Sequence, residues 1–257
     1  MKNSSPVGFL DSGIGGITVL KKSVKLLPNE NYFFFSDSLN NPYGDKTDKE
    51  IINRCSEITR YMISDKKCKA VVIACNTASA KAVRSLRAEF KNIPIIAIEP
   101  AYKVVHDKNP QGKTLIMATK GTISSEKFRR LYYSYYNHNT VIHSCVGLAD
   151  LIEQDKKSEI ISYLNSNFAR YKNQIENVVL GCTHYPLIKE EIRQTLGNVQ
   201  FFDGAEGVSK RLKYILEKDN MLNPQTNNGE IEFFDSSADE KTKELKKERF
   251  YQILNKD

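Results

Sequence analysis

The chain has 257 residues, of which 40% are hydrophobic and 27% charged, and its formal net charge is +7. This composition is typical of a globular protein with one large or two modest domains. The sequence contains no run of about 18 apolar residues, so no membrane-spanning segment is expected. The lysines are scattered and no nucleic-acid-binding motif accompanies them. Five cysteines and the lack of an apolar signal segment predict free thiols and a cytoplasmic location.

The first part of the chain alternates short apolar runs with helical patterns. Strands are predicted at 7–10, 32–35, 70–74 and 93–98, and helices at 17–27, 47–63 and 76–90. This alternation predicts a parallel sheet covered by helices. A polar loop at 36–41 and the turn Pro42-Tyr43-Gly44 follow the second strand, at the end where α/β sheets place ligand contacts.

A glycine-rich turn, Ser12-Gly13-Ile14-Gly15-Gly16, follows Asp11 and leads into the first helix. The backbone N–H groups of such a turn, together with the helix N-terminus, attract anions. The glycine spacing matches neither the P-loop nor the dinucleotide fingerprint, so the anion can be a carboxylate as easily as a phosphate. In the alternative interpretation, Asp11 is only the N-cap of the helix.

A second unit begins near Glu99 and repeats the alternation. Strands are predicted at 114–118, 140–145, 177–180 and 199–202, and helices end at 136, 168, 196 and 216. A late strand at 231–234 and a charged, solvated helix from Asp239 complete the chain. We expect an α/β protein with two pseudo-symmetric parallel-sheet domains. The first takes residues 1–98 plus 210–257, and the second takes residues 99–209.

Two stretches share one pattern, in which a buried strand ends in a small residue, a cysteine and two polar residues. They are Val71-Val72-Ile73-Ala74-Cys75-Asn76-Thr77 and Val178-Val179-Leu180-Gly181-Cys182-Thr183-His184. Each cysteine stands at a helix N-terminus, where the helix dipole favours the thiolate and lowers the thiol pKa. We expect Cys75 and Cys182 to face each other across one small substrate. In the alternative interpretation, each is a small apolar filler at a crowded turn.

Three chemistries compete for two thiols in one pocket. A zinc site would use Cys75, Cys182 and His184, but the close-spaced cysteine pair typical of zinc is absent from the sequence. A cysteine hydrolase needs one nucleophile and one histidine base, which leaves Cys75 without a role. In the third chemistry, one thiolate removes a proton from a carbon and the other thiol delivers one from the opposite face, as inversion of configuration requires.

Five motifs occur in a fixed order along the chain. They are Asp11-Ser12-Gly13-Ile14-Gly15-Gly16, Pro42-Tyr43-Gly44, Ala74-Cys75-Asn76-Thr77-Ala78, Ala118-Thr119-Lys120-Gly121-Thr122 and Leu180-Gly181-Cys182-Thr183-His184-Tyr185-Pro186. Together they resemble the glutamate racemases of the cofactor-independent aspartate/glutamate racemase superfamily. The resemblance implies a bacterial isomerase that uses no pyridoxal phosphate and no metal. It would interconvert L- and D-glutamate for peptidoglycan synthesis, in a cleft between two domains.

Two other functions stay open beside this one. A racemase of another acidic amino acid, aspartate, would belong to the same superfamily. A non-catalytic amino-acid-binding protein on the same fold would belong to another class, although the intact cysteine pair argues against it. Neither a nucleic acid nor a membrane is expected as a partner, and a homodimer is compatible with the sequence.

The resemblance also implies roles for single residues. Cys75 and Cys182 are the two catalytic acid/bases, with Asp11 assisting beside Cys75 and His184 assisting beside Cys182. The residues implied to bind the substrate are Asp11, Ser12, Tyr43, Gly44, Asn76, Thr77, Thr119, Thr183 and His184. Glu153 aligns with a pocket-side carboxylate, next to a segment (144–150) that departs from the family pattern.

Overall fold

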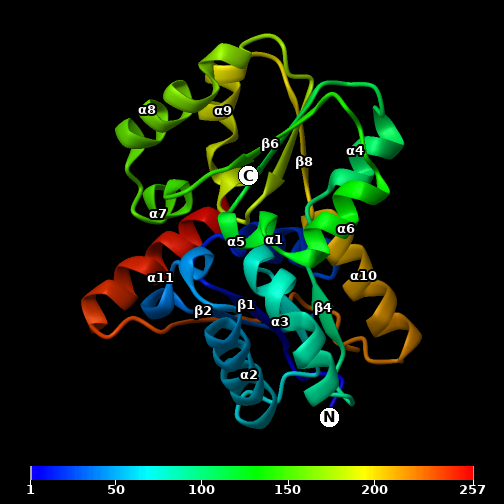
Figure 1. Ribbon diagram of the computed structural model, residues 1–257. Helices are drawn as coiled ribbons and strands as arrows, with labels where there is room; N and C mark the ends of the chain where they lie inside the picture. Colours follow the sequence, from blue (N-terminus) through cyan, green and yellow to red (C-terminus); the bar gives the residue numbers. More distant parts are fainter. Residues whose placement is uncertain (1, 257) are drawn as a thin grey trace.

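The protein forms two lobes, each built on a parallel β-sheet (Figure 1). The computed structural model describes residues 2–256. The strands are β1 (Val7–Asp11), β2 (Tyr32–Ser36), β3 (Ala70–Ile73), β4 (Ile95–Ala97), β5 (Thr114–Ala118), β6 (Thr140–Ser144), β7 (Asn177–Gly181), β8 (Gln200–Asp203) and β9 (Ile231–Asp235). The first sheet has the order β4-β3-β1-β2-β9 and the second β6-β5-β7-β8, with parallel pairing throughout both. The predicted α/β class with two parallel sheets is confirmed.

The two sheets repeat one strand order. Adding four to each strand number in β4-β3-β1-β2 gives β8-β7-β5-β6, which is the second sheet read from its other edge. The strands that precede the two cysteines, β3 and β7, therefore occupy equivalent places. Because the carboxyl ends of parallel strands lie along one edge of a sheet, each lobe delivers its cysteine at the equivalent edge.

The C-terminal part of the chain returns to the first lobe. β9 pairs with β2 as the fifth strand of the first sheet, which supports grouping these residues with the N-terminal domain. The predicted boundaries at 98/99 and 209/210 stay a prediction, and the end residues Met1 and Asp257 lie outside the described residues. Within residues 2–256, no helix is long and apolar enough to span a bilayer.

Eleven helices and four short 3-10 turns connect the strands. The helices are α1 (Ile17–Leu26), α2 (Asp48–Ser64), α3 (Asn76–Glu89), α4 (Tyr102–Lys108), α5 (Lys120–Ile123), α6 (Glu126–Ser134), α7 (Leu148–Glu153), α8 (Lys157–Phe168), α9 (Lys189–Leu196), α10 (Ala205–Lys218) and α11 (Glu240–Asn255); the 3-10 turns are η1 (Ser38–Asn40), η2 (Tyr43–Asp45), η3 (Ala169–Tyr171) and η4 (Tyr185–Ile188). These counts refer to the described residues. Sequence reasoning missed α4, which is short and buries only Tyr102 and Val105. The helix predicted over 148–168 is two helices, because Asp155 between them takes a left-handed backbone (φ 54°) that ends α7.

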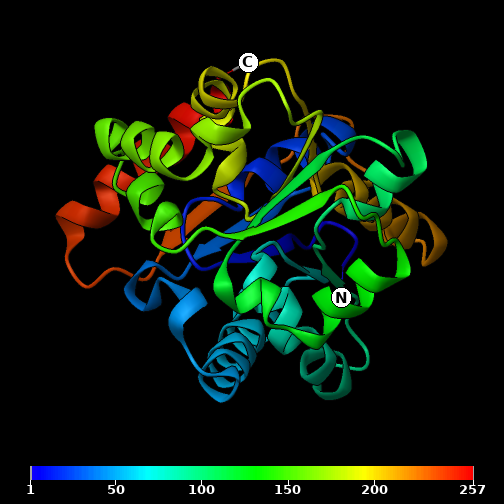
Figure 2. The same ribbon diagram turned by 45° about the horizontal axis from the view of Figure 1, so that its top comes forward.

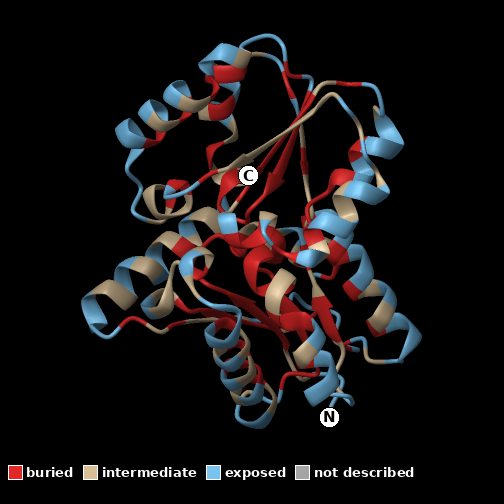
Figure 3. Ribbon diagram, in the orientation of Figure 1, coloured by how far each residue is buried: buried red, intermediate tan, exposed pale blue. Residues whose placement is uncertain are grey.

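Helices cover both faces of each sheet. Figure 2, a tilted view, shows this for the sheet of the second lobe. In the first lobe, α1, α10 and α11 pack on one face and α2 and α3 on the other. In the second lobe, α7, α8 and α9 lie opposite α4 and α6. Figure 3 shows the resulting layers, with the central strands buried between helices whose outer faces are exposed, while the edge strand β6 is only half-buried.

The C-terminal helix α11 is more than the solvated helix that its charges predicted. Phe250 is fully buried, and its ring lies 4.4 Å from that of Phe233 and 5.1 Å from that of Phe34, centroid to centroid. Burial of one phenylalanine stabilises a fold by about 2–3 kcal/mol. The prediction failed because the apolar residues of α11 that pack on the core, Phe250, Tyr251, Ile253 and Leu254, are confined to its last turns, after a long run dominated by lysine and glutamate.

Candidate active site

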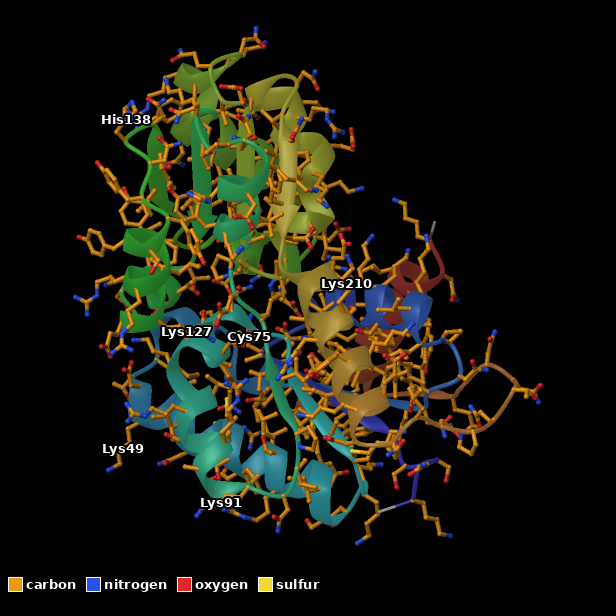
Figure 4. The ribbon with its side chains drawn as sticks, turned by 90° about the vertical axis from the view of Figure 1, so that its right-hand side faces the viewer. Lys49, Cys75, Lys91, Lys127, His138 and Lys210 are labelled. Atoms are coloured by element: carbon orange, nitrogen blue, oxygen red, sulfur yellow. The ribbon has the colours of Figure 1, made fainter. Side chains whose placement is uncertain are left out.

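A pocket lies between the two lobes, at the carboxyl ends of both sheets. Its empty volume is about 550 Å³, counted out to the solvent at its mouth. Every predicted site residue except Asp11 lines it: Ser12, Tyr43, Gly44, Cys75, Asn76, Thr77, Thr119, Cys182, Thr183 and His184. Figure 4 labels Cys75 near the level at which the lobes meet. The structure thus brings Cys75 from the first lobe and Cys182 from the second to one pocket.

The glycine-rich turn binds carboxylates of the protein itself. The N–H of Gly13 donates to Oδ1 of Asp11 (3.1 Å), and the N–H of Ile14 donates to Oε2 of Glu153 (3.0 Å). Our expectation that this turn holds an external anion is therefore wrong for these two N–H groups. The N-cap of α1 is Gly16, so the alternative in which Asp11 caps that helix is wrong as well.

Two glycines of this turn are needed for close approach between the lobes. A Cβ at Gly13 would lie 2.6 Å from Oε2 of Glu153, and one at Gly15 would lie 2.6 Å from Nδ1 of His184. Both partners come from the second lobe, and both distances are shorter than any normal contact. The turn is therefore packed so closely that a side chain at either position would displace His184 or Glu153.

Cys75 stands at the N-cap of α3 and is 6% exposed. Its Sγ lies 3.6 Å from Oγ of Ser12, which in turn donates a 3.4 Å hydrogen bond to Oδ1 of Asp11. Burial and the Asp11 charge raise the pKa of the Cys75 thiol to about 12, although the N–H of Ala78 and the Ser12 hydroxyl oppose this. The lowered pKa predicted from the helix dipole is wrong for Cys75, because loss of solvent outweighs the dipole.

Asp11 is fully buried behind Ser12. Besides Gly13 N–H, its carboxylate accepts a 2.9 Å hydrogen bond from the hydroxyl of Thr183, which crosses from the second lobe. Burial raises the pKa of Asp11 to about 6, against the opposing effects of the His184 charge and the Thr183 hydrogen bond. Asp11 thus adds negative charge on the Cys75 side of the pocket at neutral pH.

Cys182 has a histidine for a neighbour. Its Sγ lies 3.8 Å from Nδ1 of His184, whose Nε2 is 2.7 Å from Oε2 of Glu153. Burial disfavours the cationic imidazole, but Cys182 and Glu153 raise the pKa of His184 well above its usual range. Burial also acts to raise the pKa of Glu153, yet His184, the Ile14 N–H and Lys246 bring it down to about 2. A cation beside the Cys182 sulfur stabilises negative charge there.

The remaining pocket wall carries several polar side chains. The side-chain amide of Asn76 is 4% exposed, and both its nitrogen and its oxygen lack a hydrogen-bonding partner within the described part of the chain. Next to Asn76, the hydroxyl of Thr77 lies 2.8 Å from the hydroxyl of Thr119, and this hydrogen bond joins α3 to the second lobe. A buried amide without partners costs about 1–3 kcal/mol, which marks Asn76 as a group that a ligand would satisfy.

Sequence reasoning missed several residues that shape the pocket. Tyr43 donates a 2.7 Å hydrogen bond to Oδ2 of Asp37, and Arg54 donates two more to that carboxylate at 2.9 and 2.7 Å. Cys145 and Asp150 also line the pocket. A signal was available for Asp37 and Cys145, because each directly follows a strand and so lies at the same sheet edge as the predicted residues.

Two of the three chemistries fit this geometry poorly. No group of three or more His, Cys, Asp or Glu residues is placed to hold a metal ion in residues 2–256, which argues against the zinc site of Cys75, Cys182 and His184. A histidine held as a cation by Glu153 cannot accept a proton, so His184 does not suit a hydrolase base. The opposed acid/base pair remains.

Comparison with known proteins points the same way. A family model described as Asp/Glu/hydantoin racemase matches residues 21–208. Glutamate racemase from Clostridium botulinum (strain Alaska E43 / Type E3) is 42% identical over 251 residues, covering 96% of this chain and 97% of the relative. Glutamate racemase from Francisella tularensis subsp. tularensis SCHU S4, solved in complex with D-glutamate, has a TM-score of 0.81 at 30% identity, over 97% of this chain and 94% of that one.

A further solved structure extends the comparison. Escherichia coli glutamate racemase, in complex with L-glutamate and the activator UDP-MurNAc-ala, has a TM-score of 0.81 at 25% identity, over 97% of this chain and 94% of that one. The matches thus span nearly the whole of this chain and of its relatives. The chain belongs to the Asp/Glu/hydantoin racemase family.

Proposed function

We propose that this protein is a glutamate racemase, an isomerase that interconverts L- and D-glutamate by proton transfer between two cysteines. The observation that carries the proposal is the placement of Cys75 and Cys182 in one pocket, each after an equivalent strand of its lobe. Relatives named glutamate racemase align over almost the full chain. The supply of D-glutamate for peptidoglycan follows from this activity.

Each turnover consists of one proton removal and one proton delivery. In one direction, the Cys182 thiolate, stabilised by the His184 cation, takes the α-proton, and the C–H electron pair stays on the substrate as a carbanion. The Cys75 thiol then gives its proton to the opposite face of that carbon, which inverts the configuration. Cys182 ends as a thiol and Cys75 as a thiolate, and the reverse reaction uses these states.

The carbanion-like transition state needs stabilisation by groups that are already oriented. We assign this to hydrogen-bonding groups around the pocket: Ser12, Asn76, Thr77, Thr119 and Thr183. The N-terminus of α3 adds N–H groups that have no acceptor within the helix, which suits a carboxylate. Tyr43 and Gly44, which also line the pocket, complete the substrate site, with Asp11 and His184 acting on the cysteines. No cofactor enters the proposal; a cytoplasmic location and a homodimer stay predictions.

The test is incubation of the purified protein with L-glutamate in deuterated water, without any added cofactor. Optical rotation and the Cα–H signal in the NMR spectrum are followed together. We expect rotation to decay to zero while deuterium enters Cα of the D-glutamate formed. Unchanged rotation with no exchange would refute the racemase, and faster turnover of L-aspartate in a parallel sample would change the substrate. Binding of glutamate without exchange would identify a non-catalytic binding protein.

A further inference from the structure

The C-terminal helix α11 connects the first lobe to the catalytic half of the second. Phe250 anchors α11 in the core of the first lobe. From the same helix, Arg249 donates hydrogen bonds to the backbone carbonyls of Ile152 (2.7 Å) and Glu153, at the last turn of α7. Figure 1 shows α11 running directly beneath α7. A cation at a helix C-terminus is favourable, so Arg249 fixes the end of α7 on which Glu153 stands.

Lys246, one helical turn before Phe250, acts on the Glu153 side chain itself. Its Nζ donates to Oε1 of Glu153 at 3.3 Å, and it is 23% exposed. The other oxygen, Oε2, accepts from the N–H of Ile14 and contacts Nε2 of His184. Each carboxylate oxygen of Glu153 therefore has its own partners, which together determine its orientation. His184 reaches the Cys182 sulfur with its second nitrogen.

The Cys75 half of the pocket shares only the glycine-rich turn with this chain of contacts, because Ile14 N–H donates to Glu153 and the neighbouring Gly13 N–H donates to Asp11. Its supports are Ser12 and Asp11, and the latter is held by Gly13 and by Thr183. None of these contacts runs through α11. Movement of Lys246 or Arg249 would therefore displace His184 relative to Cys182 and leave the Ser12 contact of Cys75 in place.

We infer that Lys246 and Arg249 are positioning residues for the Cys182 half of the reaction, acting through Glu153 and His184. The inference rests on the proposed racemase function. It assigns to α11 a role at the pocket that its sequence, a run of lysines and glutamates, does not indicate. Neither residue touches the substrate in this assignment, since neither lines the pocket.

The rate alone cannot test which half is affected. The two enantiomers have equal free energy in water, so kcat/KM is the same in both directions whichever cysteine is impaired. A substrate isotope effect does separate the halves, because deuterium at Cα slows only the step in which that deuterium is removed. If Cys182 becomes slower, its step limits the rate more. The isotope effect then rises for the enantiomer that Cys182 deprotonates and falls for the other.

The experiment compares Lys246→Met with Lys246→Arg and with Lys247→Met, which removes the same charge from an exposed neighbour on α11. For Lys246→Met we expect kcat to fall by about 10-fold and the α-deuterium isotope effects on kcat/KM of the two enantiomers to diverge. Lys246→Arg should restore both, and Lys247→Met should match the wild type. Equal changes for both enantiomers, or the same loss in Lys247→Met, would overturn the inference.

A double-mutant cycle checks the route through Glu153. In a Glu153→Gln background, Lys246→Met should cause no further loss, whereas a full additional loss would show that Lys246 acts elsewhere. NMR signals of the His184 ring nitrogens provide a measurement that needs no turnover. They should shift in Lys246→Met and stay unchanged in Lys247→Met, and the opposite pattern would refute the contact chain. If the wild-type protein has no racemase activity, the proposed function is refuted instead. The NMR signals of His184 would still test the contacts that connect Lys246 to His184 through Glu153.

Discussion

The two cysteines follow equivalent strands of similar sheets, yet the groups beside them carry opposite charge. Cys75 faces Asp11 through Ser12, and its thiol has a pKa of about 12. Cys182 faces the imidazole of His184, which Glu153 holds as a cation. Repetition of the fold thus brings two sulfurs to one pocket, while their neighbours place a carboxylate on one side and a cation on the other. A cation stabilises a neighbouring thiolate and a carboxylate disfavours it, so the two halves of the pocket differ although their strands match.

The largest expected effect comes from removing either sulfur. Cys75→Ala and Cys182→Ala should each lower racemisation by about 10³-fold or more, since inversion needs both groups. Polarimetry measures the loss, and circular dichroism checks that the fold is intact. Cys68→Ala is the matched control, because Cys68 is a buried thiol outside the pocket. Near-normal activity of either Cys75→Ala or Cys182→Ala would refute a mechanism that needs both sulfurs.

Removal of the cation should affect only the Cys182 half. We expect His184→Gln to lower kcat by about 10²-fold. The α-deuterium isotope effect on kcat/KM should rise for the enantiomer that Cys182 deprotonates and fall for the other, because only the Cys182 step becomes slower. Rates with α-protiated and α-deuterated substrate of both configurations measure these effects. Equal changes for both enantiomers would contradict the assignment of His184 to Cys182.

Asp11, beside Cys75, should make the free energy of unfolding depend on pH. Its folded-state pKa, about 6, lies above its usual 3.8, so its protonated form stabilises the fold below about pH 4 and that stabilisation is lost as pH rises through about 6. Asp11→Asn cannot ionise. Relative to the wild type, it should gain about 2–3 kcal/mol of unfolding free energy between about pH 4 and about pH 7.5. Urea unfolding at both pH values measures this; the exposed Asp219→Asn should show no such gain.

The smallest effect concerns polar groups next to the two cysteines. The Asn76 amide has no partner among the described residues, whereas the Thr183 hydroxyl donates to Asp11. Asn76→Ala should therefore raise KM by about 10-fold with no loss of stability. Thr183→Val should lower the unfolding temperature as well, because it leaves Asp11 short of a donor. Steady-state kinetics and thermal melts distinguish the two, and a destabilised Asn76→Ala would show that its amide has a structural role.

Local sequence signals predicted much of the fold and the pocket. The apolar strands before Cys75 and Cys182 are short and unbroken, and parallel pairing follows from the helices between them. Glu153, Lys246 and Arg249 could not be connected by such reasoning, because their contacts join helices about 95 residues apart in the sequence. The direction of the Cys75 pKa also depends on burial, which a motif does not reveal.

The glycine-rich turn restricts how the sequence can vary. A methyl group at Gly13 or Gly15 would act as a wedge, because it would meet Glu153 or His184 from the other lobe, and one at Gly16 would meet Asp11. The two lobes can approach each other this closely only because Gly13 and Gly15 have no side chains. In a saturation-mutagenesis screen, we expect these glycines to tolerate substitution as poorly as the cysteines, although none of them takes part in proton transfer.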